Sequence, residues 1–269
     1  MEKIAIYGMG NVGKSLLLSL CLKEKAEIGI IDRDPKKNQA LLLDFLPFSN
    51  KIVDATESNL SDYTFLFLTV GISLNSNRDI FLKQSKKMID PVIKDIIERG
   101  FKGNLIIVSN PTDVLCSYIS RNFRKEFKNV LSTGTIIDSM RLRKNEGKYI
   151  KLYGPHGPGA ILNNKTFLNK ESLDKALEVG CKISEFGFNS SYGICLAALK
   201  LYKILTSRFK KAFIASFYND LFQVAFSHQL ILKRGKVYSR PISCDDLNPI
   251  ELKDFVQSIE QECKVFELA

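Results

Sequence analysis

The chain has 269 residues and a mass of 30.4 kDa, and 45% of its residues are hydrophobic and 25% charged. This composition is typical of a globular protein of one large or two small domains, and it excludes a disordered, collagen-like or coiled-coil chain. The net charge of +10 can attract anions. No apolar run reaches the ~18 residues of a membrane-spanning helix, and Met1-Glu2-Lys3 leads directly into a strand pattern. We therefore expect a cytoplasmic protein without a membrane partner.

The first half of the chain alternates apolar strands with amphipathic helices, which predicts a doubly wound parallel sheet with right-handed crossovers. The longest predicted helix contains Pro91, which we expect to kink or interrupt it. The predicted strands are Lys3–Met9, Glu27–Asp32, Thr64–Val70 and Asn104–Ser109, and the predicted helices are Val12–Leu22, Pro35–Phe45, Arg78–Arg99 and Asp113–Phe123.

The second half has a different pattern, which predicts a separate α+β domain. It opens with a turn rich in glycine and proline, Gly154–Gly159, and it contains an alternating pattern around Gly235 that is typical of a β-hairpin. Helices are predicted at Lys170–Phe186, Ser191–Thr206 and Pro249–Phe266. We place the boundary so that residues 1–131 form a dinucleotide-binding domain and residues 132–269 a substrate domain.

A glycine-rich motif follows the first predicted strand and opens the first predicted helix. Gly8-Met9-Gly10-Asn11-Val12-Gly13 has the spacing GxGxxG, and Asp32 ends the next strand 19 residues after Gly13. The glycines permit a tight turn and a close approach of backbone to a pyrophosphate, which the helix N-terminus attracts. Asp32 would accept hydrogen bonds from the adenosine ribose and repel a 2′-phosphate, so the motif predicts NAD as the cofactor. Lys37 is a further candidate, as a contact to the adenosine phosphate.

Neither the cysteines nor the lysines form a recognisable binding motif. The six cysteines include no CxxC pair, and His156 and His228 are the two histidines, so we expect reduced cysteines and no metal site. Basic pairs such as Lys36-Lys37 and Lys210-Lys211 are scattered along the chain. We interpret them as solvated surface and expect no nucleic-acid partner.

Three further groups of residues indicate what the cofactor is for. Asn110 follows a predicted strand at the edge of the sheet where ligands bind. Asp138 and Arg141 are three residues apart, and His156 lies in the Gly/Pro-rich turn. A histidine oriented by an aspartate moves the hydroxyl proton during hydride transfer, and an arginine binds a carboxylate through two hydrogen bonds. These residues favour a dehydrogenase of 2-hydroxy acids.

These motifs follow one another along the chain in the same order as in the L-lactate/malate dehydrogenase family, which the chain resembles over nearly its whole length. Beyond the glycine motif and Asp32, the resemblance runs through Thr69-Val70-Gly71 and Ser109–Val114. It continues through Gly134–Arg141 and Gly154–Gly157 and ends in Ser191–Ile194 and the C-terminal helix.

The resemblance implies a role for each matching residue. His156 would donate and accept the proton, paired with Asp138, and Arg141 would bind the substrate carboxylate. Asn110 would bond to the substrate oxygen beside the nicotinamide, and Arg78 would polarise the carbonyl when its loop closes. Ser190 would face the substrate. The cofactor would be lined by Gly8, Gly10, Asn11, Val12, Gly13, Asp32, Lys37, Val70, Gly71, Ser109, Asn110, Thr133 and Ile194. The resemblance also implies a homodimer or homotetramer.

The chain departs from the family pattern in two places. The loop from Gly71 to Arg78 is about two residues shorter than in most members of the family. Malate enzymes resemble one another in having a second arginine in this loop for the distal carboxylate, and the nearest candidates here are Ser73 and Leu74. A dicarboxylate would then lack a charge partner, which favours lactate over malate. The segment between His156 and Ser190 is also shorter than in the family. We expect a more open substrate pocket, and with it weak or altered activity.

The hypotheses are therefore ranked. An NAD-dependent L-lactate dehydrogenase comes first and a malate dehydrogenase second. An NAD-binding regulatory protein with little or no catalysis is the alternative from another class. An NAD-using glycosidase of related fold is disfavoured because its metal-binding cysteine and histidine have no counterpart here, and a nucleic-acid role comes last.

Overall fold

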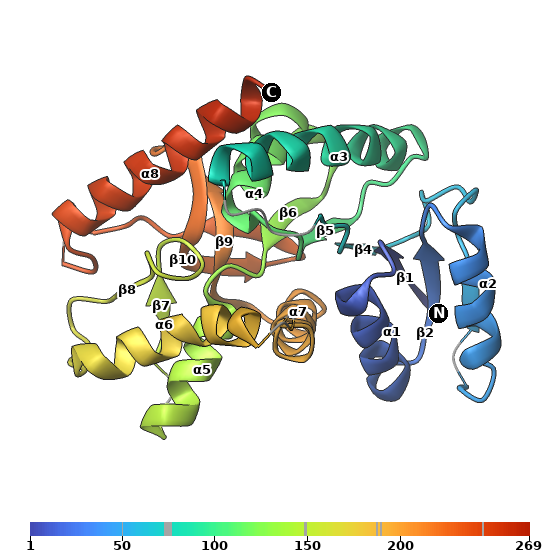
Figure 1. Ribbon diagram of the computed structural model, residues 1–269, viewed down its shortest axis with the longest axis horizontal. Coiled ribbons are helices and arrows are strands. Elements are labelled where there is room, and N and C mark those ends of the chain that lie inside the picture. The colour runs from blue at the N-terminus through green and yellow to red at the C-terminus, as the bar shows by residue number, and fades with distance from the viewer. Residues whose placement is uncertain (50, 73–76, 148–149, 187, 189, 244) are drawn as a thin grey trace.

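The computed structural model describes residues 1–49, 51–72, 77–147, 150–186, 188, 190–243 and 245–269. In this part of the chain, one nine-stranded sheet has the order β11-β10-β9-β6-β5-β4-β1-β2-β3. Helices cover both of its faces (Figure 1). The strands are β1 Glu2–Tyr7, β2 Ala26–Ile31, β3 Lys51–Asp54, β4 Phe65–Leu68, β5 Asn104–Ile107, β6 Asn129–Ser132, β9 Lys211–Asn219, β10 Val224–Lys233 and β11 Lys236–Ser239.

The parallel half of the sheet confirms the predicted doubly wound arrangement. β6, β5, β4, β1, β2 and β3 are parallel neighbours. β4 is wholly apolar, β5 is apolar after Asn104, and both are buried along their whole length because helices pack on both faces. The helices of this half are α1 Asn11–Lys23, α2 Pro35–Asp44, α3 Arg78–Glu98 and α4 Thr112–Phe123, followed by the short η1 Arg124–Glu126.

The second half continues the same sheet in antiparallel fashion. β9 joins β6 through the pair Ser132 and Ser216, and β10 and β11 extend the sheet as hairpins. β7 Leu152–Tyr153 and β8 Ile161–Leu162 form a small separate sheet. The helices are α5 Ile136–Glu146, α6 Lys170–Glu185, α7 Tyr192–Leu205 and α8 Pro249–Glu267. The predicted division between residues 131 and 132 falls where β6 ends, and it stays a prediction because the sheet runs across it.

Two apolar cores lie on the two faces of the large sheet. On one face, Ile4 and Ile6 of β1 pack with Leu16 of α1 and with α7. On the other, Ala5 of β1 packs with α3, α4 and α8. Alternate residues of one strand therefore enter different cores, as the period of a strand requires. Packing α7 on α1 brings the second half of the chain against the glycine motif.

The structure differs from the predicted elements in a few places. α3 runs through Pro91 as one helix. Pro91 is exposed, so the backbone carbonyl that loses its helical partner can bond to water, and the helix continues. β3, β6 and β9 were not among the predicted strands. β3 and β6 are only four residues long, too short to show a clear strand pattern. β9 is held in the sheet by pairing with the long strand β10.

Candidate active site

The glycine motif forms the turn between β1 and α1 that its spacing predicts. Gly8 has φ +104°, and a Cβ there would lie 2.6 Å from the Val70 nitrogen. A Cβ at Gly13 would lie 2.0 Å from the Gly8 oxygen, whereas one at Gly10 would meet no atom within 4 Å. The structure thus requires glycine at the first and third positions and leaves open space beside the second.

The start of α1 suits the phosphates of a dinucleotide. Gly10 caps the helix without a side-chain hydrogen bond, and its first turn contains no acidic residue. Free backbone N–H groups and the positive end of the helix dipole therefore face the open space at Gly10. The Thr69 hydroxyl donates to the Gly8 oxygen at 2.7 Å and fixes the turn. Asn11 is exposed and Val12 half-buried at the helix start.

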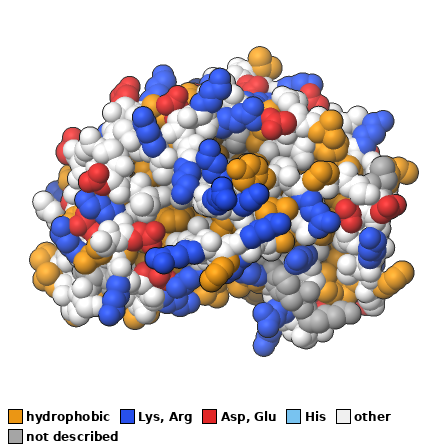
Figure 2. All heavy atoms as spheres, turned by 180° about the vertical axis from the view of Figure 1, so that it is seen from behind, with side chains coloured by type: hydrophobic (Ala, Val, Ile, Leu, Met, Phe, Trp, Pro, Cys, Tyr) orange, Lys and Arg blue, Asp and Glu red, His pale blue; other side chains and the backbone are white. Residues whose placement is uncertain are grey.

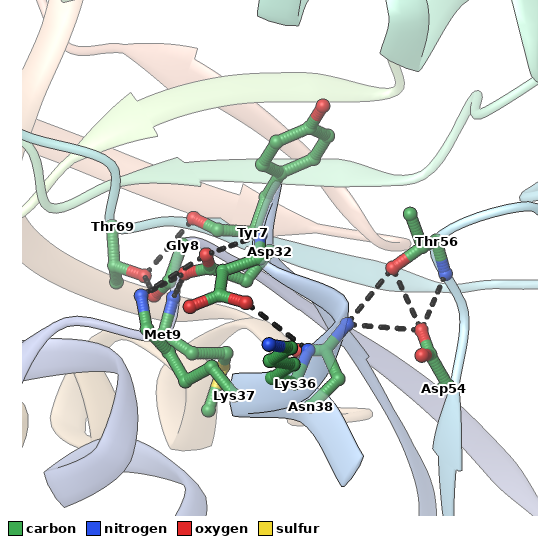
Figure 3. A network of polar contacts seen from close by, with 11 residues as sticks. Tyr7, Gly8, Met9, Asp32, Lys36, Lys37, Asn38, Asp54, Thr56 and Thr69 are labelled. Carbon is green, nitrogen blue, oxygen red and sulfur yellow. Dashed lines mark hydrogen bonds and ion pairs between the residues drawn. The ribbon is translucent and has the colours of Figure 1, made fainter.

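Asp32 is the centre of a hydrogen-bond network behind this turn (Figure 3). Its Oδ2 accepts from the Met9 N–H at 2.7 Å, and its Oδ1 accepts from the Asp34 N–H at 3.1 Å. The Lys37 ammonium lies 3.0 Å from both carboxylate oxygens. Burial opposes the charge of Asp32, but these hydrogen bonds and Lys37 outweigh burial and lower its pKa. Lys37, predicted to contact the adenosine phosphate, is thus an ion-pair partner of Asp32.

The other predicted cofactor residues lie along the carboxyl edge of the parallel strands. Ser109 bonds to the Leu68 oxygen at 3.0 Å, and the Thr133 N–H bonds to the Ile107 oxygen at 3.2 Å. Ile194 is in the first turn of α7 and half-buried. The neighbouring Cys195 thiol lies 3.3 Å from the Val12 oxygen, so Ile194 is brought near the glycine turn. Val70, Gly71 and Asn110 are half-buried or exposed at the same edge, and the Asn110–Pro111 peptide bond is cis.

His156 and Asp138 form a direct pair. His156 Nδ1 lies 2.7 Å from Asp138 Oδ2, and the Asp138 side chain is completely buried. Burial disfavours the imidazolium, but the charge of Asp138 and its hydrogen bond outweigh burial and raise the pKa of His156. The 28% of the His156 side chain that stays exposed leaves the ring accessible from the solvent side.

Arg141 lies on the same face of α5 as Asp138. Its guanidinium lies 3.3 Å from Asp138 Oδ1 and 3.4 Å from the Ser190 hydroxyl. The four predicted residues Asp138, Arg141, His156 and Ser190 therefore come together, although they span 53 positions of the sequence. An arginine beside a protonatable histidine can hold a carboxylate while the histidine exchanges a proton with the neighbouring oxygen.

Asp113 belongs to this cluster, although the sequence pattern gave it no role of its own. Its Oδ2 accepts the backbone N–H of His156 at 2.8 Å, and the whole carboxylate is buried beside the Ser216 hydroxyl. Complete burial raises the pKa of Asp113, and the hydrogen bonds from the Ser216 hydroxyl and the His156 N–H oppose that rise. The signal in the sequence was its place three residues after Asn110, in the first turn of α4. Two carboxylates from two helices thus hold the histidine turn.

Arg78 is the predicted residue that the structure does not bring to His156. It begins α3, and its guanidinium makes two hydrogen bonds of 2.7 Å with Glu262 of α8. It also lies 5.5 Å from the centre of the Phe81 ring. Ser73 and Leu74, which decided between lactate and malate in the sequence, lie outside the described residues.

Two further features bear on the type of site. A hollow of about 560 Å³ beside β7 and β8 is lined by Lys151, Tyr153 and Lys165 among others, and it contains none of the predicted site residues. The described residues contain no group of three or more His, Cys, Asp and Glu side chains arranged to hold a metal. They also contain no helix long and apolar enough to cross a membrane.

Sequence comparison finds similarity to lactate and malate dehydrogenases, most directly in the first half of the chain. Residues 2–132 match the family model of the lactate/malate dehydrogenase NAD-binding domain. The chain is 31% identical to an L-lactate dehydrogenase of Fusobacterium nucleatum over 180 residues, 60% of this chain and 56% of that protein. It is 28% identical to an L-lactate dehydrogenase of Fervidobacterium nodosum over 78% of this chain and 70% of that one. The first of these matches thus spans only about half of its relative's length.

Solved structures extend the likeness of fold to the whole chain. A minor L-lactate dehydrogenase from Enterococcus mundtii covers 100% of this chain and 98% of its own, with a TM-score of 0.84 and 21% identity. A malate dehydrogenase from Archaeoglobus fulgidus, solved in complex with NADH, covers 98% and 99%, with a TM-score of 0.83 and 16% identity. At these identities the likeness shows a shared fold.

Proposed function

We propose that this chain, which belongs to the lactate/malate dehydrogenase family, is an NAD-dependent dehydrogenase that interconverts L-lactate and pyruvate. The observation that carries the proposal is the 2.7 Å pair of His156 and Asp138 with Arg141 on the other oxygen of the same carboxylate. This arrangement supplies a proton donor and a carboxylate-binding cation side by side. The open space at Gly10 and the uncapped start of α1 support NAD as the cofactor.

The chain's own residues divide the work of pyruvate reduction. Bound NADH supplies the hydride. Arg141 holds the carboxylate of the 2-oxo acid, and its bond to Ser190 fixes the direction of the guanidinium. Asp138 occupies Nδ1 of His156, which leaves Nε2 to donate a proton to the substrate oxygen and to recover it in the reverse direction. Asp138 also stabilises the imidazolium form of His156 before the substrate binds.

Arg78 has a place in this proposal as a residue that must move. In the structure it is paired with Glu262, and polarising the substrate carbonyl requires it to leave that carboxylate. The same observation favours the second candidate function, an NAD-binding protein with little or no turnover, in which Arg78 stays on Glu262.

A homodimer or homotetramer is part of the proposal. Large apolar side chains of α1, of α2 and of the turn after α2 are exposed: Leu22 by 68%, Leu43 by 69% and Leu46 by 73%. Burying these side chains between two copies of the chain would remove apolar surface from water. Light scattering after size exclusion measures the mass, and a monomer would remove this part of the proposal.

The function is tested by NADH oxidation with pyruvate, oxaloacetate and 2-oxobutyrate, next to NADH binding measured by fluorescence. The chain contains no tryptophan, so protein emission does not obscure the cofactor signal. Turnover of pyruvate but not of oxaloacetate supports the lactate assignment. A preference for oxaloacetate makes the protein a malate dehydrogenase. Binding of NADH without turnover of any of these acids favours the second candidate function.

A further inference from the structure

The positive charge of the chain is concentrated in one stretch of sequence. Between residues 186 and 244 there are nine lysines and arginines and a single acidic residue, Asp220. In the sequence these basic residues stand as separate pairs and single positions, which is why the sequence alone predicts no nucleic-acid partner. Whether they form one surface depends on how β9, β10 and β11 lie in space.

Strand pairing brings the backbones of Lys211, Lys233 and Lys236 to one end of the sheet, where their side chains alternate between its two faces. Lys211 of β9 lies opposite Leu232 of β10, and Lys233 of β10 lies opposite Lys236 of β11. Arg234 and Gly235 form the turn between them, with φ +52° and +76°. These pairings place the start of β9 beside the tip of the hairpin, where neighbouring strands lie about 5 Å apart.

A lysine from the first half of the chain joins this group. A Cβ built on Gly235 would lie 2.8 Å from Lys128 Nζ. Asn129, the next residue, bonds through its side chain to the Gly235 oxygen at 3.0 Å and to the Val237 N–H at 2.9 Å. We call this group the basic surface. Its members are Lys128, Arg208, Lys210, Lys211, Lys233, Arg234 and Lys236.

The basic surface is exposed and has no internal neutralisation. All seven side chains are exposed, and none of them forms an ion pair with any residue that the structure describes. Lysines elsewhere do find acids, as Lys175 does with Glu171 and Lys182 with Glu178. Figure 2 shows Lys and Arg side chains gathered across the middle of one face of the molecule, with few acidic ones among them.

An aromatic side chain lies within this group. Phe209, between Arg208 and Lys210, is 80% exposed, and Tyr238 of β11 is 51% exposed. Proteins that bind single-stranded nucleic acid combine a basic track for the phosphates with exposed aromatic rings on which bases stack. An anionic membrane would instead call for a broad apolar face beside the charges, typically on an amphipathic helix. Here the charges lie on a hairpin and the start of β9, with the two exposed rings Phe209 and Tyr238.

The basic surface lies away from the candidate active site. Asn129 begins β6, so the hairpin tip is fixed at the amino end of the parallel strands. The Asp32 and His156 clusters lie at the opposite, carboxyl edge, where cofactors bind in such sheets. A ligand on the basic surface therefore leaves the cofactor site accessible.

We propose that the basic surface binds single-stranded nucleic acid, with its lysines and arginines on the phosphates and Phe209 stacked on a base. This activity is separate from the proposed dehydrogenase function, and neither depends on the other. Binding is electrostatic and independent of sequence, so it weakens steeply as salt rises.

The test measures the fluorescence anisotropy of a labelled oligouridylate of about 20 nucleotides at several salt concentrations. The variant Lys210→Glu/Lys211→Glu/Lys233→Glu/Lys236→Glu removes the centre of the surface. Its control, Lys83→Glu/Lys87→Glu/Lys94→Glu/Lys253→Glu, changes the net charge equally at exposed lysines of α3 and α8. We expect affinity to fall at least about 30-fold in the first variant and no more than about 3-fold in the control. The salt slope should also fall by roughly 0.7 for each phosphate that the variant no longer neutralises.

Two additional variants address the case in which charge reversal disturbs folding. Replacing the same four lysines by glutamine should still weaken binding about 10-fold, and Phe209→Ala should weaken it about 5-fold or more at unchanged salt slope. NADH fluorescence and thermal melting report whether each variant is folded.

Several outcomes would overturn the proposal. Equal loss of affinity in the charge-reversal variant and its control would mean that only the overall charge attracts the oligonucleotide. Displacement of the oligonucleotide by NADH would place it in the cofactor site. Binding to phosphatidylserine vesicles without binding to the oligonucleotide would make the partner a membrane surface.

Discussion

Asp32 and Asp138 are both buried carboxylates that accept several hydrogen bonds, yet their partners come from different distances along the chain. Asp32 is held by Met9, Asp34 and Lys37, all within 23 positions of it. Asp138 contacts His156, Gly157 and Arg141, and the same histidine turn is held by Asp113 of another helix. The first network therefore belongs to one strand–turn–helix unit, whereas the second exists only after α4, α5 and the histidine turn have packed together.

The two networks also leave their carboxylates in different situations. Asp32 is surrounded by donors, including a lysine, and this lowers its pKa. Asp113, in the second network, is completely buried, and this burial raises its pKa although the Ser216 hydroxyl and the His156 N–H oppose the rise. The local Asp32 network thus keeps its carboxylate charged for binding. The network around Asp138, which forms only on packing, contains groups whose protonation can change during a reaction.

The largest expected effect comes from removing the proton donor. His156→Asn should lower kcat/KM for pyruvate about 10³-fold or more, because general acid–base catalysis contributes on that order. NADH affinity should stay within about 2-fold of the original, since the variant leaves the Asp32 network intact. Stopped-flow turnover and NADH fluorescence measure the two quantities. Retention of most of the activity would contradict the role of His156.

A smaller effect is expected from Arg141→Lys, which keeps the charge and loses the planar pair of donors. We expect KM for pyruvate to rise about 10- to 100-fold because a lysine does not make the two parallel hydrogen bonds to a carboxylate. Steady-state kinetics with pyruvate and a neutral ketone analogue separate carboxylate binding from chemistry. An unchanged KM would mean that another cation holds the carboxylate.

The coupling within the His156 cluster is tested by pH. Reduction needs the imidazolium, so its rate should fall as pH rises through the raised pKa of His156, and lactate oxidation should rise over the same interval. The groups that face this ring are Asp138 and Arg141 of α5 and Asp113 of α4. Asp138→Asn should move the midpoint to lower pH, because it removes the charge that stabilises the imidazolium.

Asp113→Asn should move the same midpoint in the same direction by a smaller amount. The asparagine keeps an oxygen for the His156 N–H but loses the charge, so activity should fall no more than about 10-fold. The ring signals of His156 in NMR give the pKa without turnover, and the pKa of buried His228, lowered to about 4, keeps the two histidines apart. A midpoint identical to that of the original protein would limit Asp113 to a structural role.

The smallest effect is expected in the local network. Lys37→Met removes the ion pair with Asp32 but leaves the Met9 and Asp34 hydrogen bonds. NADH affinity should change by only about 2- to 5-fold, since the Lys37 side chain is exposed to solvent and ion pairs of exposed lysines contribute about 1 kcal/mol or less. Asp32→Asn is the matched comparison, because it leaves the N–H groups of Met9 and Asp34 in place but replaces the carboxylate by a neutral amide. It should weaken NADH binding more than Lys37→Met does. Equal effects would show that Lys37 contacts the cofactor itself.

The sequence alone was sufficient where the chemistry is local. The spacing of Gly8, Gly10 and Gly13 and their distance from Asp32 predicted a turn that the structure contains, because short-range backbone geometry dictates it. The parallel order of the first strands followed from the alternation of apolar strands and helices. The proximity of His156, Asp138 and Arg141 was expected from the resemblance to a family, because nothing in their spacing brings residue 156 to residue 138.

The tertiary structure decided the contacts between distant segments. It placed the Asp113 carboxylate on the His156 N–H and the Arg78 guanidinium on Glu262. It also gathered basic side chains from the start of β6 and from β9, β10 and β11 that appear scattered along the chain. The physical reason is the same in each case. A side chain's neighbours in sequence follow from backbone geometry, but its neighbours in space follow from which faces of strands and helices bury their apolar residues together.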